Sequence, residues 1–350
     1  MAGRQEAPTP ITWGSVGAMY RFWMDGIYAQ NLVEVRSDFQ ALEEPGFWAV
    51  VGTFEGEFTF ARFDSVSQQP FSDEAISRHA IGEWKSSLDR SEYLAYVEKI
   101  REHIADGWVY QVNACRTLTA PLKGSLSSLM RELLVSNPAP HAMYLNLPTM
   151  EIASASPELF LKVSINESGE RIALTSPIKG TSATPEFLEK DLAENVMIVD
   201  LMRNDLASIS IPGTTKVPRL LGAEAHPGLY HLVSDVSSTL KPELSWHEIL
   251  KALMPPGSVS GAPKSSAKSV IAENESARGP YCGALGWIHN GQAHLAVGIR
   301  TFWQNYDGFI HFGTGAGITW GSSAANEWEE TELKALRLMA IAEGRYARTH

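Results

Sequence analysis

One lysine stands at the end of an extended apolar run, where it could act as a nucleophile. The stretch at residues 176–181, SPIKGT, follows strand-like residues, and Pro177 and Gly180 interrupt regular structure on either side of Lys179. An amine attacks only when it is neutral, and a free lysine has a pKa of about 10.4. Burial or a neighbouring cation lowers that pKa. A solvated lysine in a turn is the simpler interpretation. Other parts of the sequence must therefore show whether Lys179 is a nucleophile or an ordinary surface residue.

A carboxylate lies on the apolar face of the longest expected helix, residues 185–207. Apolar residues surround this helix almost completely, which predicts that it is buried. Glu194 shares a helical face with Met197 and its apolar neighbours, and a buried carboxylate needs a cation, a metal ion or a proton. An ordinary ion pair with Arg203 or Lys190 is one explanation, and a metal site is the other.

A second acidic stripe lies on a helix expected at residues 323–343. Glu327, Glu330 and Lys334 fall on one side of it. An exposed Glu–Lys pair at this spacing contributes only about 0.3–0.5 kcal/mol to helix stability. On this interpretation the stripe is an ordinary solvated surface. The stripe continues into apolar residues, however, which favours a partly buried face.

Two glycine-containing stretches allow a backbone to approach an anion. Residues 315–317, GAG, follow an expected strand, and the loop at 255–264 opens a helix. In that loop Pro263 separates Gly261 from Lys264, so the spacing of a nucleotide-binding phosphate loop fails. We therefore reject nucleotide binding and keep an anion contact as a possibility.

Helices and strands interleave without a sequence repeat, which fits one large α/β or α+β unit or two domains. The expected helices lie at 91–104 (with Ser91 as N-cap), 125–135, 185–207, 246–254 and 323–343. The expected strands lie at 47–63 (a hairpin), 108–113, 142–147, 152–155, 159–161, 171–177, 214–221, 231–240, 283–289 paired with 293–302 about Asn290-Gly291, and 309–313.

The composition is that of a globular protein and excludes several classes. The 350 residues are 44% hydrophobic and carry a net charge of −11, which argues against a general nucleic-acid or membrane-surface binder. An anionic substrate would therefore need a local group of cations. Cys115 and Cys282 have no spacing typical of a disulfide framework or a zinc site. Neither a signal peptide nor a membrane-spanning run is evident, so we expect a cytoplasmic protein.

Eight stretches in series, from about residue 108 onward, resemble the chorismate-utilising enzyme family, which includes anthranilate, aminodeoxychorismate and isochorismate synthases. The stretches are 155–158 (ASPE), 177–181 (PIKGT), 193–206 (AENVMIVDLMRNDL), 231–234 (HLVS), 257–264 (GSVSGAPK), 299–301 (IRT), 315–317 (GAG) and 327–334. The resemblance implies an α+β fold in which two packed antiparallel β-sheets have helices on the outside, with a cleft between the halves. It also implies a shortened N-terminal part at 1–90 and a chorismate-binding catalytic region at 91–350, in one continuous structural domain.

The resemblance also implies roles for individual residues. Lys179, Glu158 and His231 match catalytic positions, and the division of acid and base roles between the last two stays open; a structural role for His231 is the alternative. Magnesium ligands match Glu194 and Glu330, with Glu327 beside them. Substrate contacts match Thr181, Gly261, Arg300, Gly315, Ala316, Gly317 and Lys334, with Trp287 where relatives often have a tyrosine, and Gln111 nearby.

Two positions distinguish members of the family. The residue at 179 is alanine in anthranilate synthases and lysine in aminodeoxychorismate synthases, whereas the residue at 111 is a lysine in isochorismate synthases and is Gln111 here. The resemblance thus implies amination of chorismate to 4-amino-4-deoxychorismate, for 4-aminobenzoate and folate synthesis, through covalent addition of Lys179 at C2. Ammonia would come from a separate glutamine amidotransferase subunit, because neither cysteine lies in a Gly-x-Cys-x-Gly elbow. An anthranilate-type synthase and a non-catalytic chorismate-binding subunit are the alternatives.

Overall fold

The computed structural model describes residues 20–72, 79–182, 184–226 and 229–346. Residues 1–19, which open the expected N-terminal part, lie outside the described residues. The division of the chain near residue 90 stays a prediction.

Six α-helices and two 3-10 helices are found among the described residues: α1 (Arg90–Ala105), α2 (Ser127–Ser136), α3 (Glu189–Ile209), α4 (Trp246–Leu253), α5 (Lys264–Asn274), α6 (Ala324–Ala342), η2 (Phe39–Glu43) and η3 (Gly257–Val259). The strands are β1 (Arg21–Met24), β2 (Ile27–Arg36), β3 (Phe47–Gly52), β4 (Phe58–Gln68), β5 (Ala80–Ile81), β6 (Lys85–Ser86), β7 (Gln111–Lys123), β8 (His141–Asn146), β9 (Glu151–Ser156), β10 (Leu159–Ile165), β11 (Arg171–Ser176), β12 (Ile178–Ser182), β13 (Lys216–His226), β14 (Leu229–Thr239), β15 (Gly261–Ala262), β16 (Ala284–His289), β17 (Gln292–Val297), β18 (Thr301–Gln304) and β19 (Phe309–Ile318).

The strands form one continuous antiparallel network. From β7 the pairing passes through β19, β18, β9, β8, β1 and β2, and then through β4, β3, β16, β17, β10 and β11 to β14. β12 and β13 also pair with β14. The α+β class is confirmed. The two packed antiparallel sheets that the resemblance implied are hydrogen-bonded into one sheet here, because β1 and β18 are each paired on both sides and so join the two halves.

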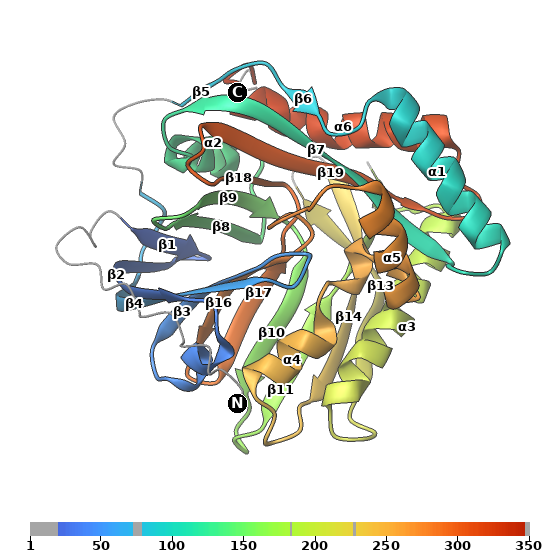
Figure 1. Ribbon diagram of the computed structural model, residues 1–350. Coiled ribbons are helices and arrows are strands. Elements are labelled where there is room, and N and C mark those ends of the chain that lie inside the picture. Colours follow the sequence, from blue (N-terminus) through green and yellow to red (C-terminus); the bar gives the residue numbers. More distant parts are fainter. Residues whose placement is uncertain (1–19, 73–78, 183, 227–228, 347–350) are drawn as a thin grey trace, which may run out of the picture.

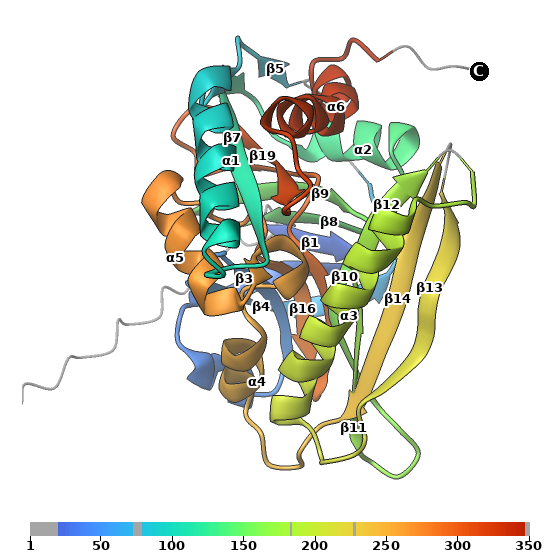
Figure 2. The same cartoon turned by 90° about the vertical axis from the view of Figure 1, so that its right-hand side faces the viewer.

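The helices lie on the outside of this network. Figures 1 and 2 show α1 and α6 over β7 and β19, and α3 across β14, in agreement with the contacts between these elements. α3 buries one side only, since Val196 is 46% exposed while Ile198, Val199 and Met202 are buried. The expectation that this helix is buried all round is therefore wrong.

Local signals explain most element ends, with two corrections. Asp89, not Ser91, caps α1: its carboxylate accepts from the backbone N–H of Glu92, whose side chain accepts from that of Asp89. The hairpin of β16 and β17 turns at Asn290-Gly291 with positive φ at both residues, as expected. Its second strand ends at Val297, however, and β18 pairs with β9 and β19 instead.

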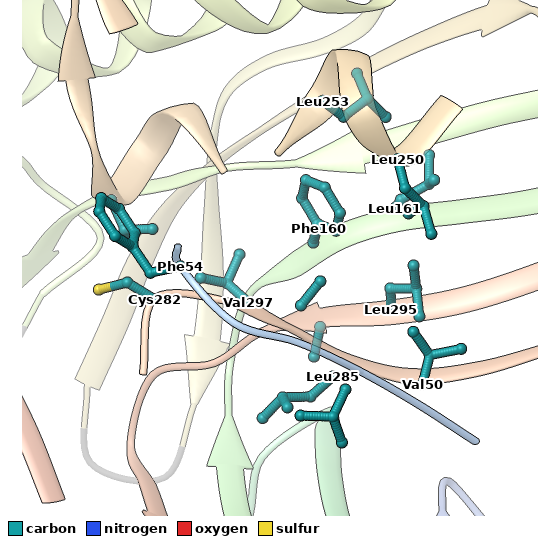
Figure 3. Close-up of a cluster of buried hydrophobic side chains, with 14 of the residues drawn as sticks. Val50, Phe54, Phe160, Leu161, Leu250, Leu253, Cys282, Leu285, Leu295 and Val297 are labelled. Carbon is teal, nitrogen blue, oxygen red and sulfur yellow. The ribbon is translucent and has the colours of Figure 1, made fainter. Parts of the chain in front are cut away.

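A large apolar core supports the strands that lead to the cleft. Figure 3 shows side chains from β3, β10, β16, β17 and α4 packed together, among them Phe160, Leu161, Leu250 and Leu295. Full burial of each such side chain contributes about 1.5–3 kcal/mol. This packing fixes β10 and β17; Glu158 directly precedes β10, and Arg300 lies in the link between β17 and β18.

Among the described residues, no helix combines the length and apolar character needed to cross a membrane.

Candidate active site

The two ends of the continuous strand network meet at Glu194. This residue belongs to α3, which packs on β14, whereas its neighbour Gln111 belongs to β7 at the other end. Gln111 Nε2 donates to Glu194 Oε1 over 2.6 Å. In Figure 2 the upper end of α3 lies beneath α6. Residues far apart in the sequence thus form opposite walls of one site.

Lys179 lies in a β-bulge that directs it toward Glu194. In the pairing of β12 with β14, Ile178 lies opposite Val233 and Thr181 opposite His231, so Lys179 and Gly180 together face a single residue. Gly180 has a φ of +89°, which glycine adopts without strain. The Lys179 side chain is only 13% exposed, and its Nζ lies 2.9 Å from Glu194 Oε1. The structure therefore excludes a solvated turn lysine.

Glu194 has a partner other than the two cations considered from the sequence. Arg203 pairs with Asp200 instead, and Lys179 occupies the position expected for Arg203 or Lys190. Burial alone would raise the pKa of Glu194, but the Lys179 ammonium and the hydrogen bond from Gln111 hold that pKa below its ordinary value.

Glu158 lies buried behind Lys179. Its side chain accepts a hydrogen bond from the hydroxyl of Ser258, and the residue is 4% exposed. Burial raises the pKa of Glu158 to about 7, although the Ser258 hydrogen bond and the Lys179 charge act in the opposite direction. A carboxyl group with this pKa can carry and release a proton near neutral pH.

His231 connects the hydroxyl of Thr181 to the guanidinium of Arg300. Thr181 Oγ1 lies 3.1 Å from His231 Nδ1, and Arg300 Nη2 lies 3.4 Å from His231 Nε2. Burial lowers the pKa of Arg300, as does the positive charge of Arg337. Among the described residues no carboxylate pairs with Arg300, so this cation is available to an anionic ligand.

The helix α6 supplies the remaining charged residues. Lys334 Nζ donates to the carbonyl oxygen of Gly315 over 3.1 Å and lies 2.6 Å from Glu330 Oε1. The charge of Lys334 also lowers the pKa of Glu194. Burial raises the pKa of Glu327, and the nearby Glu330 carboxylate adds to this rise. Glu327 is therefore partly buried, whereas Glu330 and Lys334 form the exposed i,i+4 pair that the sequence offered as the alternative.

The expected backbone contacts divide into two groups. A Cβ on Gly317 would lie 2.5 Å from Gln111 Nε2 and 3.1 Å from Glu194 Oε1, so this glycine borders the site directly. A Cβ on Gly261 or Gly315 would instead collide with β7, at the backbone oxygen of Gln111 or the sulfur of Cys115. Gly261 and Gly315 therefore permit close packing of strands. Ala316 is fully buried in β19.

Trp287 does not join the cluster. Its ring stacks on Phe47 with centroids 5.9 Å apart and lies 6.3 Å from the ring of His294. It is three residues from the start of the β16–β17 turn, whereas Arg300 lies beyond the opposite end of β17. At about 3.3 Å per residue these positions are well separated.

The donor chemistry of the cleft fits a magnesium ion. Glu194, Glu327 and Glu330 offer carboxylate oxygens, and Gln111 Oε1 is a buried oxygen without a hydrogen-bond partner. Such hard oxygen donors are those that Mg²⁺ prefers. Within the described residues no three His, Cys, Asp or Glu side chains lie close enough together to hold a metal, and Glu194 and Glu330 are each paired with a lysine.

The sequence interpretation missed two polar residues at this site. Ser258 holds Glu158, and Asn195 follows Glu194 but is fully buried. Both lie inside stretches that already resembled the family, and a polar residue beside a candidate catalytic residue was the available signal.

Fold and site together define an α+β protein in which a largely buried lysine, a buried carboxyl group and further carboxylate oxygens lie close to one another. The family model described as "chorismate binding enzyme" matches residues 55–340. The chain therefore belongs to the chorismate-binding enzyme family.

Its relatives carry two different names. The chain is 37% identical over 279 residues to anthranilate synthase component 1 of Saccharolobus solfataricus, covering 73% of this chain and 65% of that protein. It is 34% identical over 273 residues to aminodeoxychorismate synthase component 1 of Klebsiella aerogenes, covering 73% and 59%. The matched stretches thus span about three fifths of these relatives.

Solved structures agree on the fold. Anthranilate synthase component I of Streptococcus pneumoniae superposes with a TM-score of 0.74 at 23% identity, covering 97% of this chain and 95% of that chain. The menaquinone-specific isochorismate synthase of Escherichia coli gives a TM-score of 0.77 at 16% identity, covering 95% and 93%.

Proposed function

We propose that this protein aminates chorismate at C4 and so acts as component 1 of an aminodeoxychorismate synthase. The observation that carries the proposal is the Lys179 side chain, presented by a β-bulge into the cleft and 13% exposed. By the resemblance, anthranilate synthases carry an alanine at this position. A lysine beside an acid and oxygen donors suits covalent catalysis.

The proposed reaction proceeds by two displacements. The Lys179 amine adds to C2 of the ring while the C4 hydroxyl leaves, and ammonia then attacks C4 while the lysine departs. A magnesium ion held by Glu194 and Glu330 would withdraw electron density from the ring. Splitting one difficult substitution into two easier steps is the gain from the covalent route.

Proton transfer falls to two buried groups. The leaving hydroxyl needs a proton, and Glu158, with a pKa of about 7, holds one near neutral pH next to Lys179. His231 is buried between Thr181 and Arg300, which suits a group that orients the substrate or accepts a proton. We therefore favour Glu158 as the acid and His231 as the base.

Substrate binding follows from the unpaired cation of the cleft. Chorismate carries two carboxylates, one on the ring and one on the enolpyruvyl side chain. Arg300, for which the described residues offer no carboxylate, would bind the side-chain carboxylate. Lys334, whose Nζ donates to the carbonyl oxygen of Gly315, is the second cation proposed to contact the substrate.

The ammonia source is proposed to be a separate glutamine amidotransferase subunit. Related proteins are named as component 1, which supports a second component. Ammonium salts at high concentration should replace that partner in vitro.

The test is product analysis with chorismate, Mg²⁺ and an ammonium salt. We expect 4-amino-4-deoxychorismate by chromatography, and anthranilate as the sole product would refute the proposal. Lys179→Ala should abolish turnover and any covalent adduct seen by mass spectrometry, whereas Lys268→Ala, an exposed lysine on α5, should change neither. Unchanged turnover in Lys179→Ala would contradict the covalent role. Specific chorismate binding without any product would favour a non-catalytic subunit.

A further inference from the structure

A fully buried asparagine sits directly beside the proposed metal ligand. Asn195 follows Glu194 in α3 and has 0% of its surface exposed. One helical step turns the side chain by about 100°, so Glu194 faces the cleft while Asn195 faces the sheet. Asparagine is a poor helix former, and its amide is costly to bury unless both ends are hydrogen-bonded.

Both ends of this amide are satisfied by β14. Asn195 Nδ2 donates to the carbonyl oxygen of Leu232 over 3.0 Å, and Asn195 Oδ1 accepts from Ser234 Oγ over 2.6 Å. Ser234 Oγ in turn accepts from the backbone N–H of Leu221 in β13 over 2.9 Å. One chain of hydrogen bonds therefore joins α3, β14 and β13.

The position of this contact is informative. Leu232 is the residue that lies opposite the bulge formed by Lys179 and Gly180, and it follows His231. A bulge interrupts the regular pairing and redirects a side chain. The Asn195 contact thus lies between the nucleophile, the buried histidine and the carboxylate of Glu194.

A second pair of hydrogen-bonded side chains joins α3 to β14 and serves as a comparison for the contact of Asn195 with Ser234. Ser210, at the end of α3, donates to Leu206 O over 2.6 Å, and its Oγ lies 2.6 Å from Ser238 Oγ. Ser238 is four residues beyond Ser234 on the same face of β14, and both serines are buried. The two contacts hold the same helix to the same strand, but only the one at Ser234 lies beside the site.

We propose that Asn195 and Ser234 are positioning residues that set the placement of Glu194 and Lys179 relative to His231. The proposal rests on the proposed function for the roles of those three residues. Asn195 and Ser234 themselves touch neither substrate nor metal. Their contribution is to fix the rotation of α3 and the shape of the bulge, so that ligand and nucleophile face the same space.

The test compares Ser234→Ala with Ser238→Ala in the full chain. Each exchange removes one buried hydroxyl from the same strand, so the two variants should lose similar thermal stability. Mn²⁺ binding, measured by calorimetry without chorismate, should weaken about tenfold in Ser234→Ala, the low end for groups that orient a ligand. At saturating Mg²⁺ its kcat should fall more than its KM rises. Ser238→Ala should bind Mn²⁺ like the wild type.

Conservative variants keep the test decisive. Ser234→Thr retains the hydroxyl and should restore Mn²⁺ affinity, and Ser234→Cys retains the volume with a weaker donor, in case the alanine variant does not fold. Equal Mn²⁺ affinity in Ser234→Ala and Ser238→Ala would overturn the inference, as would a wild type that binds no Mn²⁺. Product identity is measured separately: a wild type that binds Mn²⁺ but forms only anthranilate would refute the proposed product alone.

Discussion

The buried carboxyl group of Glu158 should make the stability of the protein depend on pH in a specific way. Its pKa is about 7 in the folded protein against an ordinary value of 4.5. Between these two values the folded state keeps a proton that the unfolded state has lost, so the free energy of unfolding falls as the pH rises. At about 1.4 kcal/mol per pH unit, the loss is about 3 kcal/mol and is complete slightly above pH 7.

Glu158→Gln removes this pH dependence while keeping a similar shape. Between pH 5 and pH 8 the wild type should lose about 2.5 kcal/mol of its free energy of unfolding through this carboxyl group, and the variant should not show that loss. Urea unfolding at both pH values measures the change. Glu57→Gln, at an exposed position, is the control and should show the same loss as the wild type.

One outcome would refute the reasoning directly. If the difference in free energy of unfolding between Glu158→Gln and the wild type were the same at pH 5 and pH 8, Glu158 would not titrate in this range. Burial would then not be the dominant influence on its pKa, and its assignment as the acid of the reaction would lose its physical basis.

Two further predictions concern the walls of the site and the scaffold behind it. Gly317→Ala places a new Cβ 2.5 Å from Gln111 Nε2 and should displace that side chain. We expect kcat/KM to fall by roughly 10- to 100-fold with little loss of folding. Gly321→Ala, where a Cβ meets nothing within 4 Å, is the control, and equal activity of the two variants would contradict the prediction. Arg278→Met should cost about 3–5 kcal/mol in urea unfolding, because it leaves the Glu275 carboxylate, in a pair with side chains 2% and 4% exposed, without its cation. The exposed Arg203→Met should cost less than about 1 kcal/mol, and a similar cost for both would show that burial of the pair is not decisive.

The sequence was sufficient for most elements but not for their pairing. Turn residues and helix spacing are local signals, and they correctly predicted the hairpin at Asn290-Gly291 and the long helix α3. The break between β17 and β18 is set by partners: Thr301 pairs with Ser154 of β9, which lies about 150 residues earlier in the chain. The alternation of side chains along a strand contains no information on such a distant partner. The second strand of the hairpin was therefore predicted to continue to residue 302, whereas β17 ends at Val297.

Burial of α3 shows a similar limit. An unbroken apolar run predicts that a helix is covered, but coverage depends on what packs against each face. The elements β12, β13, β14, α4 and η3 all contact α3, but they leave Val196 exposed. The capping residue of α1 was misplaced by two positions for a related reason: Ser91 and Asp89 are both good caps, and only the backbone decides between them.

The candidate site was predictable as a set of residues and not as a geometry. The order of the family motifs in the sequence was enough to predict that Lys179, Glu158, Glu194 and His231 belong to one site. The pairing of Lys179 with Glu194 required the bulge in β12, whose register cannot be read from the residue types. Trp287 was included because relatives often have a tyrosine at that position, and the structure places it against Phe47.

The meeting of the two ends of the strand network has a consequence for unfinished or damaged molecules. Neither β12 with α3 nor β19 with α6 offers a complete set of reactive groups alone, since each contributes one wall. A nascent chain that has not yet folded its last helix, or a chain nicked by a protease between these segments, would bind no diene dicarboxylate productively. Under the proposed function, partly folded copies would then have no activity toward chorismate.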